Sequence, residues 1–129
     1  MQVELPLGDV VDRIAILRLK AARLGDPVQR ANVGRELDAL DRAWVAAGHP
    51  PVERLDAWDE LLDVNQRLWD VEDALREHER RGDFGPDFVR RARSVYQLND
   101  RRAALKRAVS VELGSRLVEE KSYSSSGSE

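Results

Sequence analysis

Polar side chains able to bind a ligand lie in the middle of the apolar faces of two long predicted helices. The set consists of Asn65, Glu72 and Arg76 on the first helix and Asn99, Arg102 and Lys106 on the second. At about 100° per residue, each trio shares one helical sector with bulky apolar residues. Burying an unpaired charge is costly, so the pattern predicts either a polar network or a pocket inside a bundle.

The chemistry of this cluster points to an anionic guest. One carboxylate, Glu72, accompanies three cations, which leaves a formal excess of positive charge. Arginine offers a planar fork to carboxylate or phosphate, lysine a point charge, and the amides orient polar atoms. The leading hypothesis is therefore a pocket for a small anionic metabolite, with Glu72 as its acid/base candidate. Arg18, near the apolar face of an earlier helix, would extend the cluster.

A purely structural role for the same residues competes with this hypothesis. Glu72 and Arg76 stand four residues apart and would pair with each other, and Asn65 would fix helix register. Long basic side chains also reach solvent from apolar faces. Asp12 is expected on the far side of its helix, in a solvated or interfacial strip. Under this alternative the chain is a non-enzymatic interaction or assembly module.

Helical periodicity and turn residues predict an all-α bundle of four main helices. They are expected from about 10 to 24, from 27 to the glycine at 48, from 52 to 81 and from 87 to 113. The short loop 82–86 makes the last two an antiparallel hairpin, with an acidic helix beside a basic one. Short extended segments flank the bundle. Residues 1–123 would form one domain, followed by a disordered Ser/Gly-rich tail at 124–129.

Composition narrows the classes of function. The chain has 129 residues, no cysteine and a net charge of −3, which gives no overall footprint for nucleic acid. No stretch approaches the roughly 20 apolar residues of a membrane span, so a cytoplasmic protein is expected. His49 and His78 lack the partner spacing of a metal site, and no motif indicates a cofactor. The first helix is apolar on two sides, which is typical of a central helix or a homodimer interface.

Several runs of the chain resemble a family of small uncharacterised proteins of bacteria and phages. They are the opening Gly8-Asp9-Val10-Val11-Asp12-Arg13-Ile14-Ala15-Ile16-Leu17, the run Leu68-Trp69-Asp70-Val71-Glu72-Asp73, the run Asn99-Asp100-Arg101-Arg102-Ala103-Ala104-Leu105-Lys106, and Glu120-Lys121-Ser122-Tyr123. The resemblance spans nearly the whole chain and brings no established activity. It implies that the last of these runs matters, with Lys121 or Tyr123 closing the pocket as part of a lid.

The ingredients of the cluster are also similar to those of small all-α chorismate mutases. Those enzymes rearrange their substrate by positioning and electrostatics, without a nucleophile or a cofactor. By this analogy of architecture, a cofactor-free rearrangement or lyase reaction would suit the same kind of pocket.

Overall fold

The computed structural model describes residues 2–114, which form the four-helix all-α fold that the sequence predicts. The helices are α1 (Leu7–Arg23), α2 (Pro27–Ala46), α3 (Trp58–Arg81) and α4 (Pro86–Glu112), and a short 3-10 helix, η1 (Val52–Arg54), precedes α3. The described part of the chain contains no strand, and residues 2–6 are non-helical. None of its helices combines the length and apolarity needed to cross a membrane.

Helix ends follow the predicted turn residues at two of the junctions. The Asp26 side chain accepts a hydrogen bond from the backbone N–H of Gln29 at 2.9 Å, which caps α2. Gly82 ends α3 in the left-handed conformation, with a φ of 65°, where a side chain would be strained. Asp26 therefore sets the start of α2, and Gly82 sets the point at which the chain reverses between α3 and α4.

Two helix starts differ from the expectation. The first helix begins at Leu7 instead of Val10, so that Asp9 lies inside its first turn and does not cap it. The third helix begins at Trp58, because Leu55 is extended (φ −71°, ψ 139°) after the 3-10 turn. Val52 and Leu55, at either end of this turn, are both buried.

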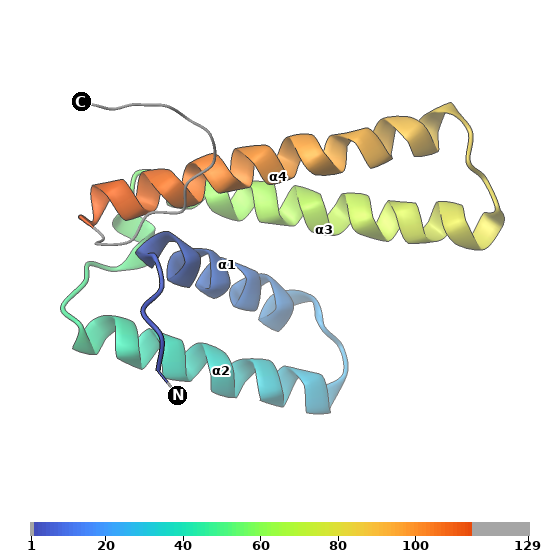
Figure 1. Cartoon of the computed structure of the whole chain (residues 1–129). Coiled ribbons are helices and arrows are strands. Elements are labelled where there is room, and N and C mark those ends of the chain that lie inside the picture. Colours follow the sequence, from blue (N-terminus) through green and yellow to red (C-terminus); the bar gives the residue numbers. More distant parts are fainter. Residues whose placement is uncertain (1, 115–129) are drawn as a thin grey trace, which may run out of the picture.

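α1 is the central helix of the fold (Figure 1). It packs against α2 on one side and against the α3–α4 hairpin on the other, while α2 makes its main contacts with α1. Val11, Ile14 and Ala15 are fully buried in α1. The two-sided apolar pattern of this helix is explained by its position between two layers.

The hairpin of α3 and α4 is longer than α1 and projects beyond it (Figure 1). Near the end of α1, Arg23 forms an ion pair with Asp70 at 2.7 Å, and its guanidinium lies over the ring of Trp69. We call the part of the hairpin beyond this point, residues 71–98, the arm. The body of the molecule therefore has three helices around α1, and the arm has two.

The first turn of α1 lies directly on the backbone of α4. A Cβ atom added at Gly8 would stand 2.0 Å from the carbonyl oxygen of Lys106, closer than any real contact. The Gly8 N–H donates a hydrogen bond to Ser110 Oγ at 2.8 Å. This close approach fixes the level at which α1 faces α4, and with it the side chains described next.

Candidate functional site

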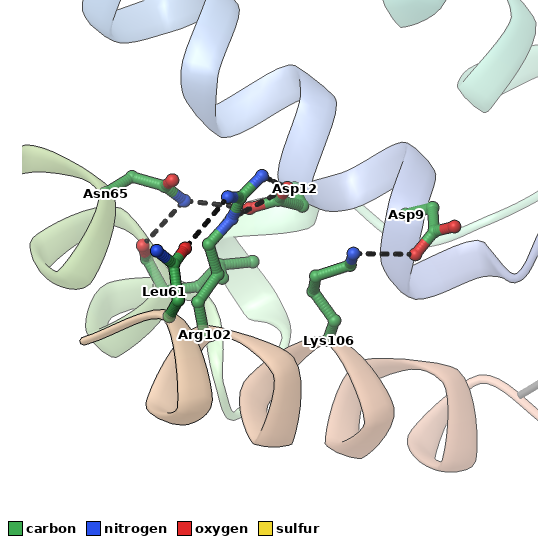
Figure 2. A network of polar contacts seen from close by, with 7 residues as sticks. Asp9, Asp12, Leu61, Asn65, Arg102 and Lys106 are labelled. Carbon is green, nitrogen blue, oxygen red and sulfur yellow. Dashed lines mark hydrogen bonds and ion pairs between the residues drawn. The ribbon is translucent and has the colours of Figure 1, made fainter. Parts of the chain in front are cut away.

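A buried carboxylate joins α1 to α3 and α4. The Asp12 side chain is 5% exposed, and it accepts a hydrogen bond from Asn65 Nδ2 at 2.8 Å and from Arg102 Nη2 at 2.6 Å (Figure 2). Arg102 Nε lies 3.1 Å from both carboxylate oxygens. Asn65 Nδ2 also donates to the carbonyl oxygen of Leu61 at 3.1 Å. The predicted inward-facing Asn65 and Arg102 thus meet on an aspartate.

Asp12 was expected in a solvated or interfacial strip, and the solvated alternative is wrong because the residue is buried. α1 is covered on more than one side, so a residue opposite its main apolar face is buried as well. The sequence carried a signal for this position, because a helix with apolar residues on both sides leaves few solvent-facing positions. Asp12 is the residue of the network that reasoning on α3 and α4 alone missed.

The positive excess predicted for the cluster is removed by neighbouring carboxylates. Arg102 is paired with Asp12, and Lys106 Nζ lies 3.1 Å from Asp9 Oδ1 (Figure 2). Arg76 pairs with Asp73 of its own helix at 2.7 Å and not with Glu72. Each of the three predicted cations therefore has a carboxylate of its own.

A pocket of about 290 Å³ opens beside this network, between α1, α3 and α4. It is lined by Ile16, Lys20, Asn65, Leu68, Trp69, Glu72, Arg76, Asn99 and Arg102. Five of the residues selected from the sequence lie on its wall together. Asn65 is buried and Arg102 half-buried, whereas Glu72, Arg76 and Asn99 are exposed toward the arm. The pocket therefore has a buried polar floor and an open, charged mouth.

Two predicted site residues stand apart from this pocket. Lys106 lies one helical turn beyond Arg102 on α4, and it forms an ion pair with Asp9. Arg18 donates to Glu53 Oε2 at 2.7 Å and lies over the ring of Trp58, at 5.1 Å from its centroid. The hydrogen bond from Arg18 lowers the pKa of the Glu53 carboxyl below its usual 4.5. Arg18 therefore links α1 to η1.

The predicted lid residues Lys121 and Tyr123, and the predicted tail at 124–129, lie outside the described residues. Their proposed relation to the pocket stays a prediction.

Lys20 and Glu72 are the two lining charges left without an ion pair among the described residues. Lys20 comes from α1 and is half-buried, and Glu72 comes from the exposed side of α3. Like Asp12, Lys20 was not among the residues that the sequence selected for the site. One cation and one carboxylate can thus meet a guest directly.

The walls between these charges are partly apolar. Ile16, Leu68 and Trp69 contribute carbon surface next to the amides of Asn65 and Asn99. Such a mixture of a few polar groups and apolar walls is typical of small-molecule sites. Among the described residues, no group of three or more histidine or acidic side chains is arranged to hold a metal ion. The arrangement is suited to binding by charge and hydrogen bonds.

The chain belongs to a family of unknown function, DUF6165, whose profile matches residues 1–129. No curated protein and no solved structure matches the chain. The family's description assigns it no activity.

Proposed function

We propose that the pocket between α1, α3 and α4 binds a small metabolite that carries one carboxylate or phosphate group. The observation that supports this proposal is the position of Lys20. Lys20 is half-buried as a residue, lines the pocket and has no ion-pair partner among the described residues. An ammonium withdrawn from water gains from a bound anion, and the pocket is where such an anion has access to it.

The charge balance of the wall limits what the ligand carries. Arg76 and Arg102 are already neutralised by Asp73 and Asp12, so they offer hydrogen-bond donors more than net charge. One open lysine suits one anionic group and does not suit a polyanion. Glu72, the unpaired carboxylate, would accept a hydrogen bond from an amine or hydroxyl group of the same ligand.

The apolar part of the pocket wall indicates the chemistry of the rest of the ligand. Trp69 and Leu68 offer a flat carbon surface on the α3 side, and Ile16 offers another on α1. A ligand of a few carbon atoms between its anionic group and its donor fits these walls. The proposal concerns binding. If a reaction follows, Glu72 is the lining carboxylate that would accept a proton from the ligand and return it.

Thermal unfolding in the presence of simple probes tests the proposal. We would add acetate, inorganic phosphate, a polar amino acid and a tricarboxylate to the full chain and measure the midpoint of unfolding. At least one of the first three probes, each of which carries a single carboxylate or phosphate group, should raise the midpoint, because a ligand bound to the folded state stabilises it by mass action. The tricarboxylate should have a smaller effect than these probes.

Two matched variants separate the pocket from general charge effects. Lys20→Met removes the open cation and should abolish the stabilisation by the probe. Arg30→Met removes one positive charge from the exposed surface of α2, a helix that contributes no residue to the pocket wall, and should leave the stabilisation unchanged. A stabilisation that persists in Lys20→Met, or no stabilisation by any probe, would contradict the proposal.

A structural role is the second candidate for the buried part of the cluster. It is favoured by the contacts of Asp12, Asn65 and Arg102, which bond to one another. On this view the network specifies how α1 sits on the hairpin, and the function lies in contacts with another protein. The two candidates differ at Lys20, which belongs to the pocket and not to the network.

A further inference from the structure

The two amides of the pocket wall and its two unpaired charges are divided between the helices by type. Asn65 and Glu72 come from α3, whereas Lys20 comes from α1 and Asn99 from α4. The contacts of each residue show which of its polar atoms are left for a guest. Those atoms are acceptors on the α3 wall and donors on the walls of α1 and α4.

Asn65 has a free oxygen, and not a free nitrogen, at the pocket floor. Its Nδ2 is used twice, donating to Asp12 Oδ1 at 2.8 Å and to the carbonyl oxygen of Leu61 at 3.1 Å (Figure 2). Because a carbonyl oxygen only accepts, the amide cannot be turned the other way. No described residue donates to Asn65 Oδ1, although the residue is only 6% exposed. A nearly buried acceptor of this kind gains from a donor on a guest.

Asn99 is oriented the opposite way. Its Oδ1 is the atom that faces Arg102 Nη1, at a long distance of 3.5 Å. Because a guanidinium only donates, this contact assigns the oxygen to the Arg102 side and leaves Nδ2 of Asn99 free. No described residue accepts a hydrogen bond from that nitrogen. Asn99 therefore offers donors to the pocket from α4.

The unpaired charges follow the same division. No ion pair joins Lys20 of α1 or Glu72 of α3 to each other or to another described residue. The two charges cancel, so a guest meets one cation and one anion. A simple anion would satisfy Lys20 but would add a second negative charge to the pocket that Glu72 lines.

We infer that the ligand of this pocket is an amino acid in its zwitterionic form. Its carboxylate faces Lys20 and Asn99, and its ammonium group faces the α3 wall of Glu72 and Asn65. This assignment rests on the proposed function, because it names the class of ligand for the same pocket. An ammonium group is a donor only and a carboxylate is an acceptor only, so each end of the ligand matches the free atoms of one wall.

The same balance favours a carboxylate over a phosphate as the anionic end. A phosphate monoester carries nearly two negative charges at neutral pH. Lys20 is the one cation of the wall that has no ion pair among the described residues. The rest of the wall, with Leu68 and Trp69 on α3 and Ile16 on α1, offers carbon surface to an apolar side chain of the amino acid.

Matched pairs of ligands test the ammonium group by isothermal titration calorimetry on the full chain. Leucine, methionine and phenylalanine are compared with 4-methylpentanoate, 4-(methylthio)butanoate and 3-phenylpropanoate, the acids that lack their amino group. At least one amino acid should bind with a dissociation constant about 10-fold or more below that of its matched acid, because hydrogen bonds between charged groups are strong. Glycine, which keeps both charges and lacks the side chain, should bind more weakly than that amino acid.

Glu72→Gln tests which group recognises the ammonium. The variant keeps the size of the side chain and removes its charge, so the preference for the amino acid should fall to about 2-fold or less. The affinity for the matched acid should stay the same or rise. Glu79→Gln is the control, because it removes the same charge from another exposed position of α3, outside the pocket wall, and should keep the preference. Lys20→Met should weaken the binding of both members of each pair.

The results separate this assignment from the proposed function. Matched acids that bind as tightly as the amino acids, or a preference that survives Glu72→Gln, would leave an anion pocket and overturn the zwitterion. If neither the amino acids nor the acids bind, the proposed function fails and the zwitterion fails with it. A preference for the amino acid that is lost in Glu72→Gln and kept in Glu79→Gln is the expected result.

Discussion

Arg102 of α4 holds the carboxylate of Asp12 in α1 with two of its nitrogens, at 2.6 Å for Nη2 and 3.1 Å for Nε. The pair is unequal in its exposure, with 5% of the Asp12 side chain accessible and 29% of Arg102. The aspartate is thus enclosed in the body, while the guanidinium extends from it to the pocket wall. One residue pair connects the packing of α1 to the geometry of the candidate site.

Removing the charge of Asp12 should therefore destabilise the fold strongly. Asp12→Asn places an NH2 group where two donors point, and we expect a loss of about 2–3 kcal/mol in the free energy of unfolding. Arg102→Met should cost a similar amount, because it leaves a buried carboxylate without its cation. Denaturant unfolding of both single variants and the double variant measures the coupling. The double variant should lose less than the sum, and strict additivity would show that the pair does not interact.

The sequence predicted the helices well because their boundaries depend on local chemistry. Asp26 caps α2 and Gly82 stops α3 through contacts within a few residues. The first turn of α1 was missed, and this turn packs through Gly8 on the backbone of Lys106, a residue distant in the sequence. Local signals do not report a contact between helices so far apart along the chain.

The candidate site could be predicted only in part, for a related reason. Helical phase correctly grouped Asn65, Glu72 and Arg76 on one side of α3, and they line one pocket with Asn99 and Arg102. Phase on two helices could not show that a third helix supplies Asp12 and Lys20. The predicted charge of the site was wrong because the carboxylates that neutralise it come from other faces and elements.

The contact of Gly8 with α4 gives a second prediction. Gly8→Ala should destabilise the protein by about 2–3 kcal/mol, since the new methyl group overlaps the Lys106 carbonyl and forces α1 to shift. Gly34→Ala is the matched control, because Gly34 lies inside α2 and an added Cβ would meet no atom within 4 Å beyond its chain neighbours and the backbone of its own helix. The control should gain about 0.5–1 kcal/mol through better helix propensity. Chemical denaturation compares the two, and equal effects would contradict the close approach.

The ion pair between Arg18 and Glu53 predicts a small dependence of stability on pH. The pKa of Glu53 is lowered in the folded state, mainly by the hydrogen bond from Arg18. A lowered pKa stabilises the folded state above the unfolded value of 4.5, and this contribution is lost as the pH falls through the folded pKa. Both side chains are partly solvated, so Glu53→Gln should cost only about 0.2–1 kcal/mol at neutral pH. The difference in the free energy of unfolding between wild type and Glu53→Gln should vanish in acid. A difference that does not change with pH would contradict this prediction.

His78 gives a prediction that separates the stability of the arm from that of the body. It is 2% exposed, its Nε2 accepts from Arg91 at 2.7 Å, and its Nδ1 lies 3.0 Å from the carbonyl oxygen of Asp83. Since Arg91 is a donor only, the contacts assign the proton to Nδ1, which donates to that carbonyl. The Phe88 ring packs against the same imidazole in an edge-to-face arrangement, with centroids 5.8 Å apart. One side chain thus joins α3, the loop and α4 at the end of the arm.

His78→Leu keeps the apolar contact with Phe88 and removes both hydrogen bonds. Because Arg91 and Asp83 are exposed and can turn to water, the cost should be moderate, about 1–2 kcal/mol. The loss should be local, since α1 and α2 do not cover the arm. Amide hydrogen exchange should therefore speed up between residues 74 and 95 and stay nearly unchanged at Val11 and Ile14 in the core of α1. His49→Leu, which removes the ring that packs on Trp44 near the end of α2, is the control and should leave exchange in the arm unaffected. Uniform acceleration over the whole chain in His78→Leu would show that the arm does not open independently of the body.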